Sequence, residues 1–548
     1  MSTPFEISDR LTEKWADLNP IGATLCGIAG RDHLPGDASP QAYAYLEELF
    51  RTTRAEMAPH HDHPDPAQAF AARVTTDYLD QRLRELESKK WRRDINHISS
   101  PFQHMRDVFD VMPRETPEHW ENIVSRLNGY PGLLDGYQES LSRGIDAKDT
   151  VAVRQVESLI DQVEAAASND SRFLAFVEQA RSAGADPDVV AAAVDVARRA
   201  CGRFADWLKT EYLPMARPED AVGRDEYVLG VDRWVGMDLD LEETYEWGWS
   251  EVHRIRDEME QTAKQIDPDK SVTEVIALLE TDPARSAATR DEFVEFVSNL
   301  QQQAIDQLDG DHFDVPDELK TVTVSIAPPG GSLGAWYVGP SEDMSRPGSI
   351  WYSPGERERI PYWQEVSTAY HEGFPGHHLQ VGTEVLQREK LSRFHRSVIF
   401  YSGSAEGWAL YAERLMDELG FFEKPEYRLG LLASQLFRSV RVVVDIGCQL
   451  ELEIPDGAPL HAGEVWDYNR AVDYMDKIGL QPRDIAESEV TRYLGWWGQA
   501  IAYKVGEREI LGIRKKARTR EGFDLKDFHR RVLEIGTVRL DLLREMMS

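Results

Sequence analysis

Cysteine is scarce in this chain of 548 residues. Only Cys26, Cys201 and Cys448 occur, far apart in the sequence and outside any Cys-x-x-Cys pattern. Their odd number and wide spacing argue against a disulfide framework and against a thiolate metal cluster. We therefore expect all three to be ordinary core residues.

Long apolar runs are missing as well. No stretch of the sequence approaches the roughly 18 consecutive apolar residues that a membrane-spanning helix needs. The opening Met-Ser-Thr-Pro-Phe-Glu-Ile-Ser-Asp-Arg lacks the basic start and apolar run of a secretory signal. We expect a cytoplasmic protein.

Positive charge is in deficit, because 62 Lys and Arg stand against 96 Asp and Glu and give a formal net charge of −34. A field of this sign repels phosphate backbones and anionic lipid surfaces. We expect neither a nucleic acid nor a membrane as partner. An oligomer is neither indicated nor excluded.

Helical periodicity dominates what the sequence does contain. Residues 191–212 and 245–266 repeat apolar side chains near every 3.6 residues, as amphipathic helices do. The main interruption is residues 321–352, where short alternating or β-rich segments are separated by turn residues. This interruption predicts a small sheet of about three strands, which either pairs with an extended substrate or is a structural hairpin.

The strongest chemical signal is residues 370–380, Tyr-His-Glu-Gly-Phe-Pro-Gly-His-His-Leu-Gln. In a His-Glu-x-x-His helix two imidazoles four residues apart meet one metal, and the Glu between them reaches the bound water. Here the fourth position after His371 is Pro375, which opens the helix. A bulge at Pro375-Gly376 would bring His377 into the place of the second ligand, with His378 as the alternative.

A third ligand is available downstream in the segment Ser404-Ala405-Glu406-Gly407-Trp408, which reads as the start of a helix. Zinc sites of the two-His, one-Glu type take their glutamate from a second helix and leave one position open. We predict one Zn²⁺ ion held by His371, His377 and Glu406. A carboxylate that only stabilises a helix N-terminus would explain Glu406 equally well if it were considered alone.

The chain resembles a bacterial family known as domain of unknown function 885, whose pattern His-Glu-x-x-Pro-Gly-His-His-Leu-Gln is matched at residues 371–380. Further matching segments lie at Leu18-Asn19-Pro20, Ser345-Arg346-Pro347-Gly348, Ala405-Glu406-Gly407-Trp408-Ala409, Arg492-Tyr493, Gly498-Gln499-Ala500 and Tyr503-Lys504-Val505-Gly506. The chain departs from the family at Gln449, where many members have histidine.

That family is similar, at a distance, to the thermostable carboxypeptidases of the Taq type. The resemblance implies a mainly α fold, a single large helical zincin-like body with a deep cleft and the small sheet beside the metal helix. We expect one metallopeptidase-like domain over residues 1–548. Residues 1–320 would be a helical part forming one cleft wall, and residues 321–548 would carry the metal site, the sheet and the C-terminal helices.

The predicted activity is zinc-dependent, carboxypeptidase-like hydrolysis of amide bonds in short peptides. Glu372 is the candidate general base, and Tyr503 and Tyr493 are candidate donors to the oxyanion. Arg441 and Arg492 are candidate clamps for a substrate carboxylate. Two alternatives stay open: a catalytically inactive binding protein of the same fold, and an amide hydrolase acting on a non-peptide metabolite.

Overall fold

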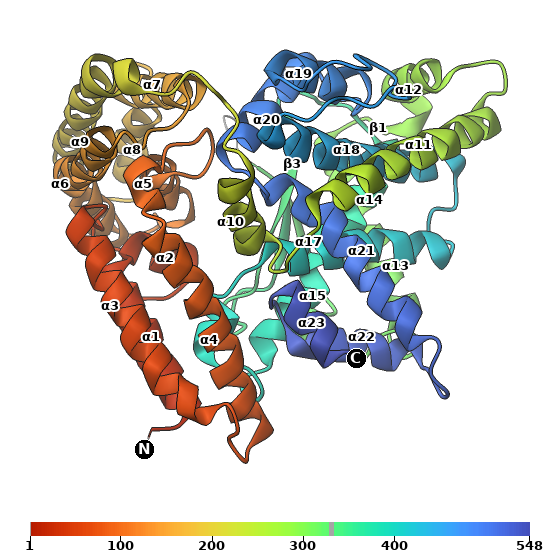
Figure 1. Ribbon diagram of the computed structural model, residues 1–548, viewed down its shortest axis with the longest axis horizontal. Helices are drawn as coiled ribbons and strands as arrows, with labels where there is room; N and C mark the ends of the chain where they lie inside the picture. The colour runs from red at the N-terminus through yellow and green to blue at the C-terminus, as the bar shows by residue number, and fades with distance from the viewer. Residues whose placement is uncertain (1, 328–333) are drawn as a thin grey trace. The chain divides into compact units, whose positions relative to one another are not determined.

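A computed structural model describes residues 2–327 and 334–548 of the chain (Figure 1). They divide into two compact units, which are described separately. Unit 1 comprises residues 1–222, 392–399 and 491–496, and unit 2 comprises residues 223–391, 400–490 and 497–548. The expectation of a single domain stays a prediction, as does its division into one cleft wall over residues 1–320 and a part with the metal site over residues 321–548.

The regular secondary structure of unit 1 is helical over its described residues, apart from one isolated bridge between Ala152 and Arg217. Its helices are α1 (Pro4–Leu18), α2 (Pro20–Leu25), α3 (Pro40–Met57), α4 (Pro66–Glu87), α5 (Pro101–Val111), α6 (Pro117–Ala147), α7 (Val153–Ala167), α8 (Ala175–Ser182), α9 (Pro187–Trp207) and the short α16 (Arg393–Ser397). Seven of them begin with proline preceded by Thr, Asn, Ser or Asp. Proline has no N–H to leave unsatisfied at the first helical position, and the preceding polar side chain caps the free N–H groups.

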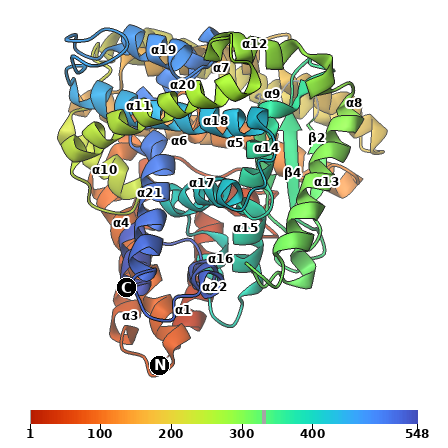
Figure 2. The same ribbon diagram turned by 90° about the vertical axis from the view of Figure 1, so that its right-hand side faces the viewer.

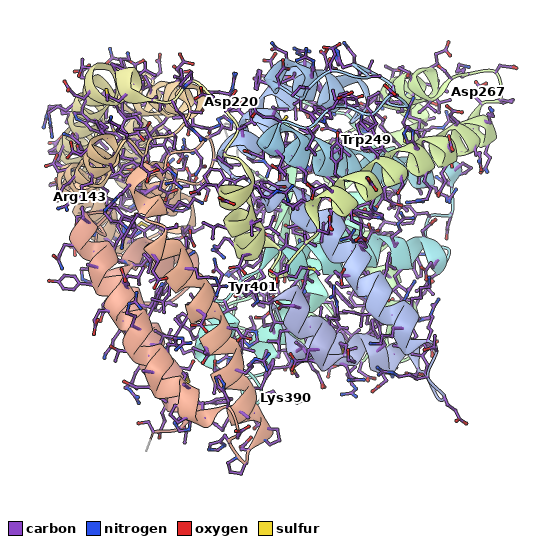
Figure 3. All side chains as sticks on the ribbon, in the orientation of Figure 1. Arg143, Asp220, Trp249, Asp267, Lys390 and Tyr401 are labelled. Carbon is purple, nitrogen blue, oxygen red and sulfur yellow. The ribbon has the colours of Figure 1, made fainter. Side chains whose placement is uncertain are left out.

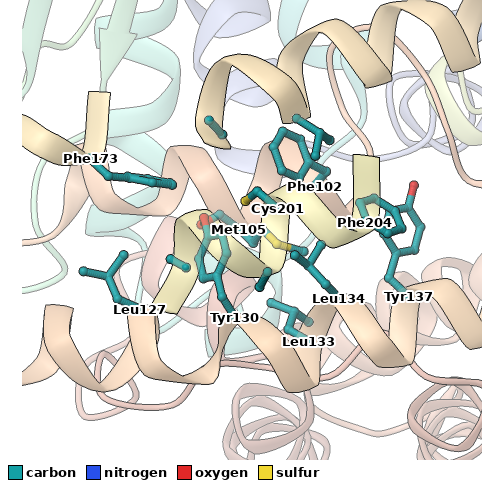
Figure 4. Close-up of a cluster of buried hydrophobic side chains, with 14 of the residues drawn as sticks. Phe102, Met105, Leu127, Tyr130, Leu133, Leu134, Tyr137, Phe173, Cys201 and Phe204 are labelled. Carbon is teal, nitrogen blue, oxygen red and sulfur yellow. The ribbon is translucent and has the colours of Figure 1, made fainter. Parts of the chain in front are cut away.

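The core of unit 1 forms where α6 packs against α9. Tyr130, Leu134 and Tyr137 of α6 lie close to Cys201 and Phe204 of α9 in one buried cluster (Figure 4). The cluster is rich in aromatic rings, whose large apolar area makes them strong contributors to burial. The prediction of a core position is confirmed for Cys201 and Cys448. It is wrong for Cys26, which is exposed because it only caps the end of the short α2.

Unit 2 contains the remaining helices and every strand that the structure describes. Its helices are α10 (Arg224–Trp234), α11 (Leu241–Ile266), α12 (Val272–Thr281), α13 (Arg290–Leu308), α14 (Tyr362–Glu372), α15 (His377–Leu386), α17 (Ser402–Glu418), α18 (Pro425–Leu450), α19 (Tyr468–Lys477), α20 (Arg483–Gly495, whose last turn belongs to unit 1), α21 (Gln499–Ala517), α22 (Leu525–Ile535) and α23 (Leu540–Met546). The prediction of a mainly helical protein is confirmed. Among the described residues, no helix is both long enough and apolar enough to cross a bilayer.

The predicted small sheet is present as β2 (Thr323–Ile326), β3 (Gly334–Val338) and β4 (Ser349–Ser353). The strand order is β2-β4-β3, with β2 parallel and β3 antiparallel to the central β4. Figure 2 shows the sheet between α13 and α14, and residues of these three elements share one buried cluster. A second, two-stranded ladder pairs β1 (Ser286–Ala287) with β5 (Ile360–Pro361), immediately before α14.

Long helices in close contact support the site in unit 2. On α11, Trp249 (labelled in Figure 3) stacks on Trp466 with ring centroids 6.3 Å apart, and α11 packs along α18. Helix α17 crosses α21 where Gly407 meets Gly506, and a Cβ on Gly407 would lie 2.6 Å from the backbone of Gly506. Two glycines allow this close approach, which fixes the start of α17.

Candidate metal centre

The segment with the strongest chemical signal forms the end of one helix and the start of the next. Helix α14 ends at Glu372 and α15 begins at His377, so the chain is not helical over residues 373–376. The predicted opening of the helix at Pro375 is therefore present. It is wider than the expected two-residue bulge, because α14 stops completely before Gly373 and a new helix starts.

Side chains from other helices bind the polar groups of this turn. Gln301 of α13 donates from Nε2 to the carbonyl of Ala369 (2.8 Å) and accepts from the N–H of Phe374 at Oε1 (2.6 Å). Trp408 of α17 donates from Nε1 to the carbonyl of Pro375 (2.9 Å). The buried peptide groups of the turn thus have partners that lie far away in the sequence.

Gly376 allows the turn to fold back onto α14. Its N–H donates to the carbonyl of Tyr370 (3.1 Å), and a Cβ at this position would lie 2.0 Å from the carbonyl oxygen of His371. No side chain fits there without displacing backbone. The glycine therefore permits the return of the chain that carries His377 to the ring of His371.

The turn brings His371 and His377 together with Glu406 of α17. Glu406 Oε2 lies 3.2 Å from His371 Nε2 and 3.5 Å from His377 Nε2, and the two imidazole rings are nearly perpendicular with centroids 4.9 Å apart. Ligands bound at 2.0–2.1 Å to one tetrahedral ion are roughly 3.4 Å from one another. The spacing of these three side chains therefore suits a single ion.

The chemistry of the donor set also suits a zinc ion. Glu406 Oε2 is buried and takes no hydrogen bond from any residue that the structure describes. A buried carboxylate oxygen without a hydrogen bond is costly, and a cation placed between it and the two imidazoles would remove that cost. Two neutral imidazoles and one carboxylate form a common catalytic zinc ligand set, with the fourth position open.

A second carboxylate, which the sequence reasoning missed, orients His371. Glu413 Oε1 lies 2.7 Å from His371 Nδ1, and Glu413 Oε2 accepts from the hydroxyl of Ser367 (2.6 Å). This contact keeps a proton on Nδ1 and directs the lone pair of Nε2 toward Glu406. The available signal was spacing, because Glu413 follows Glu406 by two turns on the same face of α17.

Burial and the clustered charges shift the pKa values of the centre in opposite directions. Burial of the imidazolium would lower the pKa of His371, but the carboxylates of Glu406 and Glu413 raise it to about 9. Burial would likewise raise the pKa of Glu406, but contact with the two histidines holds it well below its usual range. Burial raises the pKa of Glu372, against the effect of the two histidines. Glu372 thus combines a position directly after the first histidine with a basicity above that of an ordinary carboxylate.

Both ring nitrogens of His378 have hydrogen-bond partners outside the candidate metal centre. Its Nε2 donates to the carbonyl of Leu319 (2.9 Å), so its Nδ1 is the nitrogen that accepts from the hydroxyl of Tyr337 (3.0 Å). With one nitrogen protonated and the other occupied, the buried ring has no lone pair left for a metal. Of the two candidate second ligands, His377 is the one that the fold brings to His371 and Glu406.

Arg441 and Tyr503 lie together on neighbouring helices of unit 2. The guanidinium carbon of Arg441 is 4.9 Å from the ring centroid of Tyr503 and 4.1 Å from that of Phe437, and Arg441 pairs with Glu489 at 2.9 Å. A second arginine of α18, Arg438, approaches the same tyrosine ring at 5.8 Å. Sequence reasoning did not select Arg438.

Arg492 and Tyr493 belong to unit 1, unlike the three candidate ligands. Within that unit the guanidinium carbon of Arg492 lies 4.8 Å from the ring centroid of Tyr493, which is buried. Their expected roles in catalysis and substrate binding stay predictions. Gln449, the departure from the family pattern, is buried near the end of α18, and its carbonyl accepts from Gly223 N–H at 3.1 Å.

Comparison with known proteins gives a family and a fold. The model of the family described as "Bacterial protein of unknown function (DUF885)" matches residues 20–547. A crystal structure of a "putative lipoprotein" from Colwellia psychrerythraea is similar over 99% of this chain and 98% of that chain, with a TM-score of 0.84 and 21% identity. A "putative lipoprotein of unknown function" from Shewanella oneidensis is similar over the whole of both chains, with a TM-score of 0.75 and 16% identity. No curated protein matches the chain. At these identities the two structures establish a shared fold alone.

Proposed function

We propose that this chain, which belongs to the bacterial family of unknown function DUF885, is a zinc-dependent peptidase that hydrolyses amide bonds in short peptides. The observation that carries the proposal is the convergence of His371, His377 and Glu406, whose ligand atoms lie within 4.8 Å of one another. The orienting contact from Glu413 to the far nitrogen of His371 supports it, because metal-binding histidines commonly have such a partner. The distant resemblance to carboxypeptidases of the Taq type belongs to the same proposal.

In the proposed hydrolysis the three ligands hold the metal and Glu372 transfers the proton. A zinc ion held by the three ligands would lower the pKa of a water molecule and polarise the scissile carbonyl. Glu372 accepts the proton of the attacking water and then delivers it to the leaving nitrogen. The raised pKa of Glu372 suits both steps, because a group that is too acidic would hold the proton too weakly to pass it on.

Tyr503 is the candidate donor to the oxyanion in unit 2. Its ring is placed by Arg441 and Arg438, whose guanidinium groups lie against it. Tyr493 and Arg492, which belong to unit 1, stay candidates for the same two tasks. The edge strand β3 contacts α14 and could pair with an extended peptide through its backbone.

Metal content and hydrolysis together test the proposal. The purified chain should carry about one zinc per molecule, as expected for a three-ligand catalytic site. It should cleave members of a random tripeptide library, with activity lost to chelator and restored by zinc. Glu372→Gln should keep the zinc and lose the cleavage. Glu358→Gln, which changes an exposed carboxylate just before α14, is the matched control and should keep both.

Two other results would redirect the assignment. Stoichiometric zinc with peptide binding but no cleavage of any peptide would favour the inactive binding protein. Cleavage of simple N-acyl amides, with tripeptides left intact, would favour the hydrolase of non-peptide amides. Absence of zinc after preparation without chelators would contradict the metal centre itself.

A further inference from the structure

Arg438 occupies a distinctive position beside the metal centre. Its NH2 lies 3.9 Å from Glu413 Oε1, the same oxygen that contacts His371 Nδ1 at 2.7 Å. One carboxylate therefore separates its guanidinium from the ring of the first ligand. The Arg438 side chain is 16% exposed, close to the 14% of His377 and the 15% of Glu406, so all three remain reachable by a solute.

The hydrogen-bonding groups of Arg438 are largely unused. NH1 donates to the carbonyl of Ser434 at 3.3 Å, whereas the distance from NH2 to Glu413 is too long for a hydrogen bond. Nε is buried and donates to no residue within the described parts of the chain. A guanidinium has five N–H donors, and leaving buried donors unpaired costs free energy. The N–H donors left on NH1 and NH2 form an edge that a ligand with two acceptor oxygens would satisfy, whereas Nε lies too deep to be reached.

The neighbouring arginines differ from Arg438 in this respect. Arg441, one turn further along α18, pairs with Glu489 at 2.9 Å and lies between the rings of Phe437 and Tyr503. Arg414 on α17 pairs with Glu507 at 2.9 Å. Each of these two already has a hydrogen-bonded carboxylate inside the protein, and Arg438 does not.

The charge of the site favours such a cation if the substrate is an anion, because the three carboxylates outweigh the two charges of a bound zinc ion. Glu372, Glu406 and Glu413 place three carboxylates around the two histidines, in a chain whose net charge is −34. A free carboxylate on a peptide would be repelled from this region unless a positive group faced it. The planar fork of arginine matches a carboxylate with two parallel hydrogen bonds.

We propose that Arg438 binds the free C-terminal carboxylate of the peptide and makes the enzyme a carboxypeptidase. Arg441 and Tyr503 support its position from the side, with Tyr503 in contact with both guanidinium groups. The proposal therefore assigns recognition of the substrate carboxylate to Arg438 instead of Arg441 and Arg492, the two arginines predicted from the sequence. The role of Arg438 depends on the proposed peptidase function only where the reaction is called carboxypeptidase, because the binding of a carboxylate can be measured without turnover.

The test measures binding to the full-length, zinc-loaded Glu372→Gln protein, in which peptides bind without being consumed. The probes are a random tripeptide library with free C-terminal carboxylates and the same library amidated at the C-terminus. Equilibrium dialysis followed by mass spectrometry gives the ratio of retained acids to retained amides. We expect acids to be retained about 10- to 100-fold better, the range that hydrogen bonds to a charged group provide.

Substitutions in the same background assign that preference to a residue. Arg438→Gln should bring the ratio of acids to amides close to one, and Arg438→Lys should retain part of the preference because it keeps the charge without the fork. Arg428→Gln is the matched control, since Arg428 lies on α18 and pairs instead with Glu258 and Asp417. It should leave the ratio unchanged. Zinc content and thermal unfolding of each variant check that the site remains folded.

The outcomes separate the two proposals. Equal retention of acids and amides by the Glu372→Gln protein, including no retention of either, overturns the role of Arg438, as does an unchanged preference in Arg438→Gln. A preference that depends on Arg438, combined with no hydrolysis when Glu372 is intact, supports Arg438 and rejects the peptidase. Equal hydrolysis of both libraries rejects Arg438 and supports the peptidase.

Discussion

Glu413 Oε1 lies 2.7 Å from His371 Nδ1, and both side chains are buried. The pair ties the first candidate ligand on α14 to the helix that also supplies Glu406. A carboxylate in this position fixes the tautomer of the imidazole and increases the basicity of its other nitrogen.

Replacing Glu413 by glutamine should weaken zinc binding about 10- to 100-fold, the usual effect of losing such an outer carboxylate. Competition with a chromophoric chelator measures the affinity. Glu418→Gln is the control, because Glu418 lies on the same helix and pairs with Arg514 at a partly exposed position. An unchanged affinity in Glu413→Gln would mean that His371 needs no orienting partner.

The two adjacent histidines should respond in opposite ways to substitution by alanine. His377→Ala should lose the bound zinc and keep its stability, because His377 is only partly buried and a proposed ligand. His378→Ala should keep zinc and lose about 1–3 kcal/mol of unfolding free energy, since the Leu319 carbonyl and the Tyr337 hydroxyl would lose their buried partner. Metal analysis measures the bound zinc, and chemical denaturation measures the unfolding free energy. If His378→Ala lost its zinc and His377→Ala kept it, His378 would be the second ligand in place of His377.

A methyl group at Gly376 should disrupt the turn between the ligands. Gly376→Ala places a Cβ against the carbonyl of His371. We expect the unfolding free energy to fall by about 1–3 kcal/mol and zinc binding to weaken. Gly512→Ala is the matched control. Gly512 lies on an exposed face of α21 with open space around it. Alanine there should raise the unfolding free energy by about 0.5–1 kcal/mol, because alanine is the better helix former. Equal stability of the two variants would contradict the close approach described for the turn.

The stability of the fold should depend on pH through His529. Burial lowers the pKa of this histidine from 6.5 to about 4, and its Nε2 contacts the hydroxyl of Tyr411 at 2.7 Å. The unfolded chain therefore binds a proton at a higher pH than the folded chain does. The stabilisation is complete above pH 6.5 and is lost as the pH falls toward 4, by about 3 kcal/mol for a shift of this size.

Denaturation at several pH values checks the contribution of His529. His529→Gln removes the titrating ring, so its unfolding free energy should fall less between pH 6.5 and pH 4 than that of the unaltered chain. Other ionisable groups are common to both proteins and cancel in the difference. Parallel pH profiles for the two proteins would exclude His529 as the source.

The sequence pattern was sufficient to predict the helical class, the three strands and the three side chains that converge. The strands and the break in the helix are local features: alternation identified β2, β-rich runs separated by turn residues identified β3 and β4, and Pro375 indicated the interruption after α14. Glu406 was selected because zinc sites of the two-His, one-Glu type take their glutamate from a second helix. The partners that complete the site were not predicted. Arg438 and Gln301 come from helices whose contacts with the motif depend on packing, and no spacing in the sequence connects them with it.

Gln301 illustrates how far the site extends beyond its motif. A protein piece that began at residue 321 would include every proposed ligand and Glu372, yet it would lack the amide that binds both Ala369 and Phe374. Its turn would have an unpaired N–H at Phe374, and the Ala369 carbonyl would keep only its bond from the N–H of Gly373, at the point where His377 must be directed. We conclude that a shortened protein designed around the motif alone would contain all the metal-binding side chains without the geometry that makes them a site.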